Sequence, residues 1–257
     1  MQLNGRKIIL TGCARGIGAA TLRAYVAQGA HVAALDVLDE EGEAAVSHAN
    51  DAGPGKAFFV HCDVASRDET GRAVSEAVAT LGGLDVLAHI AGVERTAPAE
   101  MIDDDHWDLM MDVNARGTMI INQAVFPHMQ EKGGQIINFA SAAGVRGMAG
   151  GAAYSAAKGA VLAWSRCIAQ EWARYNITVN AMAPGMWTPM YDAHRGRMSN
   201  SELAAHDAVM AMHIPLGGKL GDPDRDMAPV MVFMASPAAH FITGQTLPVD
   251  GGMLMLT

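Results

Sequence analysis

The first 27 residues hold the feature that most limits how this chain can fold: a strand pattern, a glycine-rich turn and a helical pattern in direct succession. Residues 7–11 are largely apolar, and residues 12–18 read Gly-Cys-Ala-Arg-Gly-Ile-Gly. Apolar residues then recur at helical spacing through Leu22, Tyr25 and Val26. This order is typical of the first unit of a parallel α/β sheet, in which the turn binds a dinucleotide.

Each glycine of the turn has its own expected role. Gly12 permits the tight turn, Gly16 lets backbone amides approach a pyrophosphate, and Gly18 permits close packing. Arg15 and Ile17 lie in the same turn, at a helix N-terminus whose dipole favours an anion, so we expect them to contact the cofactor too. The glycines are not spaced as in the commonest dinucleotide motif, and an ordinary glycine-rich connection is the alternative.

Strand-like runs alternate with helical patterns along the rest of the chain. The runs cover residues 7–11, 31–35, 56–62, 84–90, 135–140, 177–182 and 245–249. Such alternation predicts a parallel sheet with right-handed crossovers, in which ligands bind at the carboxyl ends of the strands. The 257 residues are 50% hydrophobic and contain no linker or internal repeat, which favours a single domain over residues 1–257.

Asp36 ends the second predicted strand, 18 residues after Gly18. This offset is close to that of the acid that binds the adenosine ribose diol, and its charge would repel a 2′-phosphate. The sequence therefore favours NAD over NADP as the cofactor. Arg15 weakly favours NADP, since a cation there could pair with that phosphate, although it could equally be a solvated loop charge.

Small and polar residues follow three further strands. They are Asp63 and Val64 after the third strand, Ala91 and Gly92 after the fourth, and Pro184 and Gly185 after the sixth. Because the carboxyl ends of parallel strands meet at one edge of a sheet, we expect all of them to line the cofactor site. Asp63 either accepts a hydrogen bond from adenine or caps the following helix, and the sequence leaves both open.

Ser141, Tyr154 and Lys158 form a candidate catalytic group. Tyr154 and Lys158 are four residues apart in an Ala-rich helical pattern, so they share one helix face. A neighbouring ammonium, together with the positive ring of an oxidised nicotinamide, would lower the tyrosine pKa from about 10 toward the working pH and suit it to acid/base catalysis. Ser141 follows a buried strand, from where its hydroxyl would hold a substrate oxygen. A Tyr and a Lys at this spacing also occur together by chance.

Asn114 lies inside an amphipathic pattern between residues 106 and 128, which predicts one long helix. An amide in the middle of a helix normally points outward. Its functional alternative is to hold a water behind Lys158, which would complete a proton path to solvent.

Residues 186–215 are polar and apolar by turns, with Met186, Trp187, Met190 and Tyr191 near the start. Long insertions in compact domains are often lids, so the segment predicts a helical flap over the substrate site. Its methionines suit an adaptable apolar pocket, although filling a core or contacting a subunit is their commoner role.

The composition argues against several kinds of partner. The formal net charge is −9 at pH 7 and no Lys/Arg cluster is present, which disfavours nucleic acid and anionic membrane surfaces. No apolar run reaches the roughly 18 residues of a membrane span. The three cysteines are widely separated and not at metal-ligand spacing, so we expect reduced thiols and no metal site. A cytoplasmic protein that acts on a small molecule fits these features.

Together the motifs resemble the short-chain dehydrogenase/reductase family over nearly the whole chain. The matching positions are Thr11, Gly12, Gly16, Gly18, Asp63, Ala91, Gly92, Asn114, Ser141, Tyr154, Lys158, Pro184, Gly185, Thr188, Gly244 and the run Asp250-Gly251-Gly252. The resemblance is specific because independent motifs occur in the family's order. It implies an α/β fold with a Rossmann-like, doubly wound parallel sheet of about seven strands and helices on both faces.

The resemblance also implies a role for each candidate residue. Tyr154 would donate or accept the proton, Ser141 would hold the substrate oxygen, and Lys158 would bind the nicotinamide ribose and lower the tyrosine pKa. Asn114 would anchor a water of the proton relay, and Thr188 would touch the nicotinamide amide. The family is usually tetrameric, so the resemblance implies a homotetramer in which the helices carrying Asn114 and Tyr154 pair across an interface.

Two departures from the family pattern stand out. The family commonly has Asn-Asn-Ala-Gly where this chain has His89-Ile90-Ala91-Gly92, so we expect reduced polar bracing at that strand end. Cys13 takes a position often held by glycine or a small polar residue, and a packed thiol is the expected result.

The leading functional hypothesis is an NAD-dependent oxidoreductase that interconverts a secondary alcohol and a ketone. An apolar cyclic or aromatic substrate is expected from the side chains flanking the reaction centre, which are Val93, Val145, Met148, Trp187, Met190 and Tyr191. The alternative enzyme is a 3-oxoacyl thioester reductase using NADPH, for which Arg146, His194 and Arg195 could bind an acidic or carrier-linked substrate. From another class, a non-catalytic cofactor-binding regulator would be expected to lack one of the four catalytic residues, and all are present.

Overall fold

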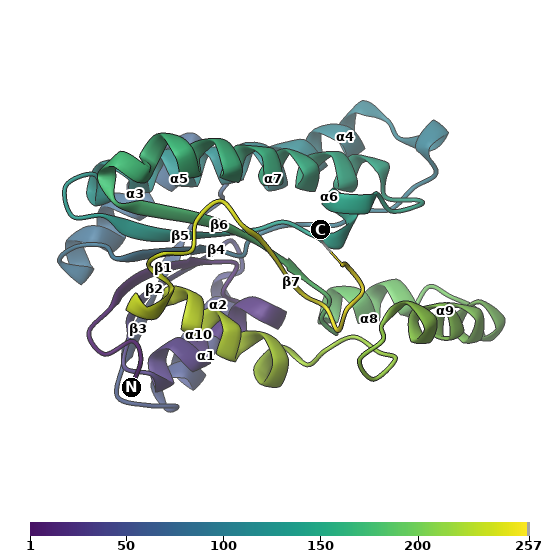
Figure 1. The fold of residues 1–257 in the computed structure, drawn as a ribbon, viewed down its shortest axis with the longest axis horizontal. Helices are drawn as coiled ribbons and strands as arrows, with labels where there is room; N and C mark the ends of the chain where they lie inside the picture. The colour runs from purple at the N-terminus through teal and green to yellow at the C-terminus, as the bar shows by residue number, and fades with distance from the viewer. Residues whose placement is uncertain (256–257) are drawn as a thin grey trace.

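The computed structural model describes residues 1–255, apart from the side chain of His194. Its centre is one parallel sheet with strand order β3-β2-β1-β4-β5-β6-β7 (Figure 1). The strands are β1 (Lys7–Thr11), β2 (His31–Asp36), β3 (Lys56–His61), β4 (Val86–His89), β5 (Gly134–Phe139), β6 (Ile177–Pro184) and β7 (Thr246–Val249). The strand order reverses between β1 and β4, which is the point where ligands bind in doubly wound sheets.

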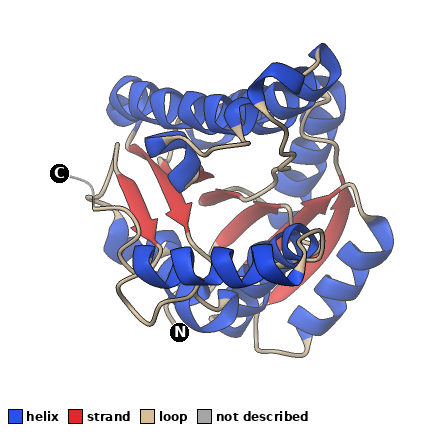
Figure 2. Ribbon diagram, turned by 90° about the vertical axis from the view of Figure 1, so that its right-hand side faces the viewer, coloured by secondary structure: helices blue, strands red, loops and turns tan. Residues whose placement is uncertain are grey.

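Helices cover both faces of the sheet, as expected. One layer contains α1 (Gly16–Ala27), α2 (Asp39–Asn50) and α10 (Ala228–Ala235), and the other contains α3 (Arg67–Leu81), α5 (Gly117–Met129) and α7 (Ala152–Trp172) (Figure 1). Seen from the side of the strands' carboxyl ends, the sheet lies between these two layers (Figure 2). The fold is therefore the Rossmann-like α/β arrangement that the resemblance implied.

The strand sequences are apolar throughout because both faces of the sheet are buried. In β1, Ile8 and Leu10 pack in the core beneath α1, α2 and α10, whereas Ile9 between them packs in the core on the opposite face. Side chains alternate across a strand, so a strand covered on both sides needs apolar residues at every position. This pattern made the strands recognisable from the sequence.

The predicted long helix around Asn114 is interrupted. The segment consists of α4 (Asp104–Met110), a π-helical turn η2 (Met111–Arg116) and α5. A π-helical turn widens the helix by one residue and often occurs at functional sites. The outward position that is usual for a mid-helix amide does not apply here, because the side chain of Asn114 is fully buried.

Two helices project beyond the carboxyl ends of the strands at the right of Figure 1. They are α8 (Pro189–Arg195) and α9 (Asn200–His213), which follow β6 in the segment predicted to be a helical flap. The short helix α6 (Ala142–Arg146) follows β5 and packs against α7. The remaining short turns are η1 (Ala99–Met101), η3 (Ala173–Tyr175), η4 (Pro223–Met227) and η5 (Pro237–Ala239). Within the described residues, no helix has both the length and the apolar character to span a bilayer.

Candidate active site

The glycine turn after β1 is packed so closely that two of its positions admit no side chain. Gly12 has a positive φ of +72°, and a Cβ atom there would lie 2.6 Å from the amide nitrogen of Ala91. A Cβ atom on Gly18 would lie 1.7 Å from the carbonyl oxygen of Gly12. The turn, the end of β4 and the start of α1 are therefore held against one another by backbone contact.

The N-terminus of α1 is open to an anion. Arg15 is the N-cap residue, but its side chain makes no capping hydrogen bond, and the first turn contains no acidic residue. The amides of the first turn, including those of Gly16 and Ile17, have no acceptor within the helix and are suited to a diphosphate. A Cβ atom on Gly16 would lie 3.5 Å from Cδ of Pro189, so this turn faces the start of α8. A dinucleotide fits this cradle.

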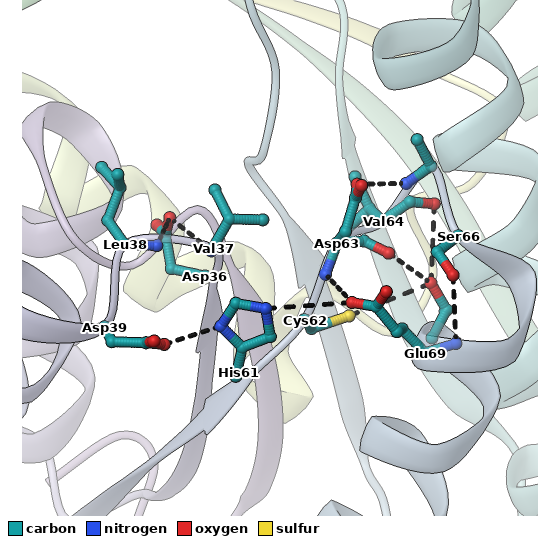
Figure 3. Close-up of polar contacts among 12 residues, drawn as sticks. Asp36, Val37, Leu38, Asp39, His61, Cys62, Asp63, Val64, Ser66 and Glu69 are labelled. Carbon is teal, nitrogen blue, oxygen red and sulfur yellow. Dashed lines mark hydrogen bonds and ion pairs between the residues drawn. The ribbon is translucent and has the colours of Figure 1, made fainter.

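Asp36 lies beside the turn, at the end of β2 (Figure 3). Its Oδ2 accepts a hydrogen bond from the amide of Ala14 at 2.9 Å, and its Oδ1 accepts one from the amide of Val37 at 2.8 Å. Arg15, the residue that weakly favoured NADP, forms an ion pair with Glu41. Asp36 is thus fixed next to the glycine turn, and the guanidinium of Arg15 is paired with Glu41.

His61, at the end of β3, connects the first turns of α2 and α3, a role that was not predicted from the sequence. His61 contacts Asp39 through Nδ1 at 2.6 Å, and its Nε2 lies 3.8 Å from Oε2 of Glu69 (Figure 3). These carboxylates raise the pKa of His61 above its ordinary value, with the hydrogen bond to Asp39 as the main cause. The signal in the sequence was an exposed histidine at a strand end followed by acidic residues.

The helix-capping alternative for Asp63 is wrong. The N-cap of α3 is Ser66, whose hydroxyl accepts a hydrogen bond from the amide of Glu69 at 3.4 Å. The Oδ1 of Asp63 accepts instead from the amide of Ala65, which precedes the helix, at 2.9 Å (Figure 3). The adjacent Val64 is buried and lies close to Gly117 of α5.

The structure brings Ser141, Tyr154 and Lys158 together. Ser141 follows β5 as the N-cap of α6, and its hydroxyl hydrogen bonds with the phenol of Tyr154. Lys158 lies one turn further along α7, with its ammonium 5.8 Å from the centre of the Tyr154 ring. The ammonium also donates to the carbonyl oxygen of Phe139 at 2.9 Å, so the lysine is tied to the end of β5.

Close packing of α6 on α7 sets the relative position of Ser141 and Tyr154. A Cβ atom on Gly144 of α6 would lie 2.6 Å from the carbonyl carbon of Lys158 and 2.8 Å from the amide nitrogen of Gly159. Only glycine allows this approach at residue 144. This position was not predictable from the sequence, because a glycine in a short helix carries no periodic signal.

The expected lowering of the tyrosine pKa is not found in the protein's own side chains. Burial raises the pKa of Tyr154 to about 12, and the hydrogen bond from Ser141 offsets this only in part. Burial also lowers the pKa of Lys158 to about 8. The carboxylate of Glu94, two residues after Gly92, raises both pKa values. Any lowering of the tyrosine pKa therefore depends on the positive nicotinamide ring that the expectation also included.

Asn114 faces this group from the π-helical turn. Its Nδ2 donates to the carbonyl oxygen of Val93 at 2.9 Å and to that of Met110 at 3.0 Å, and its Oδ1 accepts from the amide of Val93 at 3.2 Å. A Cβ atom on Gly92 would lie 2.8 Å from Oδ1 of Asn114 and 3.1 Å from Nζ of Lys158. Asn114 and Lys158 therefore both lie against Gly92.

Polar bracing at the end of β4 is not reduced, contrary to the expectation from the missing asparagines. The buried imidazole of His89 has Nδ1 2.7 Å from Oγ1 of Thr11 and Nε2 3.1 Å from Oγ1 of Thr118. A histidine reaches two partners on opposite sides, so it replaces the expected amide. Cys13 is buried in the core, as predicted, and burial raises the pKa of its thiol to about 12.

The remaining predicted cofactor residues lie at the end of β6 and just beyond it. Pro184 ends β6, and a Cβ atom on Gly185 would lie 2.9 Å from Cβ of Asp250 in the Asp-Gly-Gly run. The hydroxyl of Thr188 accepts a hydrogen bond from the amide of Tyr191 at the start of α8. Thr188 therefore has a local role in beginning α8 as well as facing the glycine turn.

Helices α8 and α9 are held together by an aromatic and ionic cluster. The guanidinium of Arg195 lies 4.8 Å from the ring of Trp187 and pairs with Asp207 of α9. The hydroxyl of Tyr191 is 2.8 Å from Nε2 of His206. Because Arg195 is engaged within the flap, it is poorly placed to bind an acidic substrate. Arg146 is exposed, and the side chain of His194 lies outside the described structure.

The fold and the site define a class of protein: a doubly wound dinucleotide-binding α/β protein with a Ser-Tyr-Lys group beside its glycine turn. The particular family follows from comparison with known proteins. A family model described as enoyl-(acyl carrier protein) reductase matches residues 12–254. The chain belongs to the short-chain dehydrogenase/reductase family, whose members are oxidoreductases that bind a nicotinamide cofactor, NAD or NADP.

Similar proteins match over almost their full length. The chain is 40% identical to the short-chain reductase protein NovJ of Streptomyces niveus over 248 residues, covering 95% of this chain and 92% of NovJ. It is 35% identical to 2,5-dichloro-2,5-cyclohexadiene-1,4-diol dehydrogenase of Sphingobium indicum over 255 residues, covering 98% of each chain. A solved short-chain type dehydrogenase/reductase from Mycobacterium ulcerans has a TM-score of 0.91 at 29% identity, covering 98% of this chain and 91% of that chain.

Proposed function

We propose that this protein is an NAD-dependent oxidoreductase that interconverts a secondary alcohol and a ketone, with Tyr154 as the general acid and base. The observation that carries the proposal is the continuous contact between the glycine turn and the catalytic group. Gly12 lies against Ala91, and the next residue, Gly92, lies against Lys158 and Asn114. A dinucleotide bound at the turn would therefore end beside the tyrosine.

Each catalytic side chain has a physical role in this reaction. Ser141 would donate a hydrogen bond to the substrate oxygen and orient it toward the hydroxyl of Tyr154. In the oxidative direction Tyr154 accepts the alcohol proton, and in the reductive direction it returns a proton to the ketone oxygen. The ammonium of Lys158 would bind the nicotinamide ribose and so hold the positive ring close enough to Tyr154 to favour its phenolate. The nicotinamide, when bound, supplies the hydride acceptor or donor.

Asn114 would anchor a water of the proton relay through its main-chain carbonyl. Its side chain is fully used by Val93 and Met110, so the amide group itself serves to fix the loop after β4. A carbonyl oxygen has two lone pairs and can accept a second hydrogen bond. A water there would link the Lys158 ammonium to solvent.

The preference for NAD rests on Asp36. Its carboxylate is fixed beside the turn by the amides of Ala14 and Val37, where it would accept hydrogen bonds from the ribose diol and repel a 2′-phosphate. Arg15 is neutralised by Glu41. We assign Asp63 and Val64 to the adenine end of the same site.

A neutral, apolar and cyclic or aromatic alcohol is the proposed substrate. The Sphingobium relative is named for a chlorinated cyclohexadiene diol, which is a neutral cyclic alcohol. The carboxylate of Glu94 acts on both Tyr154 and Lys158 and would disfavour an anionic substrate at this position. The alternative is a 3-oxoacyl thioester reductase using NADPH, and it is supported by a relative named as a 3-oxoacyl-[acyl-carrier-protein] reductase in Thermotoga maritima, which is 34% identical to this chain.

We propose that α8 and α9 form a flap that covers the substrate. Trp187 and Met190, at its start, are partly exposed and adjacent to Thr188, which faces the glycine turn. Residues 1–257 would act as one domain, and a cytoplasmic location fits the proposal. We further propose a homotetramer in which α5 and α7 pair across an interface, since small exposed residues such as Ala156 and Ala163 on α7 permit close helix contact.

The experiment that tests this function is an absorbance screen at about 340 nm, where reduced nicotinamide absorbs. Secondary alcohols, cyclic diols and 3-oxoacyl thioesters are each assayed with both NAD and NADP forms. We expect oxidation of a neutral cyclic alcohol with NAD. Turnover restricted to thioesters with NADPH would favour the alternative enzyme, and NAD binding without turnover of any substrate would indicate the regulator.

A further inference from the structure

The end of β4 contains a chain of hydrogen bonds that connects the two halves of the proposed site. His89 pairs with Thr11 across β4 and β1, and its side chain is buried between β1 and the start of α5. Its two ring nitrogens contact the hydroxyls of Thr11 and Thr118 on opposite sides. One threonine belongs to the strand that enters the glycine turn, and the other is one helical turn after Asn114.

The direction of every bond in this chain follows from hydrogen-bond chemistry. The hydroxyl of Thr118 lies 2.6 Å from the carbonyl oxygen of Asn114. A carbonyl only accepts, so the single hydroxyl proton of Thr118 is donated there. Oγ1 of Thr118 can then only accept from the imidazole, which places a proton on Nε2 of His89.

The other nitrogen of the ring is then an acceptor. A neutral imidazole carries one proton, so Nδ1 of His89 accepts from the hydroxyl of Thr11. Oγ1 of Thr11 in turn accepts from the amide of Ala91 at 3.3 Å. All the bonds run in one direction, from the Ala91 amide through Thr11, His89 and Thr118 to the Asn114 carbonyl.

The surroundings keep the imidazole neutral. Burial, with a further contribution from the positive charge of Lys158, lowers the pKa of His89 to about 3. A doubly protonated ring would have no acceptor for the Thr11 hydroxyl and would place a second positive charge near Lys158. The chain therefore keeps one tautomer near neutral pH.

We propose that neutral His89 is a positioning residue for the reaction, which aligns the Asn114 carbonyl and its relay water with the cofactor turn. The inference rests on the proposed function, because Asn114 matters to catalysis only if a proton leaves through it. Thr118 donates its hydroxyl proton to the Asn114 carbonyl, the same oxygen that would hold the relay water. His89 thus couples the position of that water to Ala91, which lies against Gly12.

The test uses variants that break the chain at known links. Thr118→Val removes only the last two bonds. His89→Asn keeps an acceptor near the Nδ1 position for Thr11 but no donor that reaches Thr118, whereas His89→Gln keeps a donor near the Nε2 position. Thr21→Val is the matched control, since Thr21 is buried and its hydroxyl has no hydrogen-bond partner among the described residues.

The measurements are the single-turnover rate of hydride transfer at saturating NAD, the Kd for NAD and the melting temperature. We expect Thr118→Val and His89→Asn to slow hydride transfer about tenfold, the usual effect of one lost hydrogen bond, with the NAD Kd unchanged. His89→Gln should retain more of the rate than His89→Asn, and Thr21→Val should match the wild type. Lower melting temperatures with no change in rate would overturn the proposal and leave His89 a structural residue.

A second measurement does not depend on turnover. Nitrogen NMR of the imidazole should show the Nε2-protonated tautomer, unchanged down to about pH 5. A protonated Nδ1, or titration near the ordinary histidine pKa, would contradict the hydrogen-bond chain. Failure of the proposed function is recognised separately, by a wild type that oxidises no alcohol or by turnover that survives Tyr154→Phe.

Discussion

Lys158 is a buried cation, and burial is what most affects its proton affinity. Its side chain is only 4% exposed, and its pKa falls from 10.5 to about 8. The donated hydrogen bond to Phe139 and the nearby Glu94 carboxylate do not restore the ordinary value. At neutral pH the lysine is charged, as its role in the site requires, but the fold is destabilised by that charge.

This destabilisation predicts a pH dependence of stability. Between the folded pKa of about 8 and the unfolded value of 10.5, the unfolded chain binds more protons, so stability contributed by Lys158 rises with pH in that window. Between pH 7 and pH 9.5, the free energy of unfolding of the wild type should rise by about 2 kcal/mol relative to that of Lys158→Met. Urea unfolding of both proteins at the two pH values measures this, and parallel pH dependences would refute it.

In the proposed function, the choice between NAD and NADP depends on Asp36. Asp36→Ala should reduce kcat/KM with NAD by roughly 10- to 100-fold, since hydrogen bonds to a charged group are lost, while kcat/KM with NADP should hold or rise. The control is Asp39→Ala, whose exposed carboxylate contacts His61. Equal losses with both cofactors would instead mean that the turn near Ala14 had loosened.

Some site residues could be predicted from the sequence and others could not. Gly12 and Gly18 were predictable because backbone contact at those positions excludes every other residue. The role of His89 was not, since the sequence shows only that an asparagine is missing and not that two threonines lie on either side. Arg195 was offered as a substrate-binding cation, but it is paired with Asp207 from a separate helix.

At the scale of elements, the contact between α6 and α7 positions the proposed catalytic group. Gly144→Ala should cost about 1–3 kcal/mol of stability because its Cβ would meet the backbone at Lys158, and it should slow turnover by displacing Ser141 from Tyr154. Gly159 lies across the same contact, but a Cβ atom there would meet only the carbonyl oxygen of Gly144, at 3.5 Å, so Gly159→Ala is the matched control. That control should instead stabilise α7 by about 0.5–1 kcal/mol.

Urea unfolding and single-turnover assays of the two alanine variants measure these effects. Similar stability and rate in Gly144→Ala and the wild type would show that α6 does not set the position of Ser141.

The strands were more predictable than the helix around Asn114. Strand residues such as Ile8, Ile9 and Leu10 are apolar at every position because both faces are covered, and this pattern is visible without a structure. The π-helical turn at Met111–Arg116 adds one residue per turn over a short span, which hydrophobic periodicity does not resolve.

At the scale of the whole molecule, α8 and α9 project beyond the carboxyl ends of the strands. The helical character of residues 186–215 was predicted and is confirmed by α8 and α9. The contacts of Tyr191 with His206 and of Arg195 with Asp207 could not be predicted, since they depend on α9 folding back beside α8. These contacts make the two helices a single unit.

The proposed tetramer is a prediction about assembly. Light scattering should give a mass about four times the 27.0 kDa of the chain. Ala156→Arg, at an exposed position on α7, should reduce the mass by placing a bulky charge in the proposed helix contact. A wild-type mass equal to that of one chain at micromolar concentration would rule out the tetramer.

The central claim is that the hydroxyl of Tyr154 moves the substrate proton beside a dinucleotide bound at the glycine turn. The most direct measurement is the single-turnover rate of nicotinamide reduction in Tyr154→Phe, with saturating NAD and an alcohol that the wild type oxidises. We predict a fall of at least about 100-fold, because proton transfer of this kind supplies that much rate, with the Kd for NAD unchanged. A Tyr154→Phe variant that reduces NAD at the wild-type rate would contradict the account.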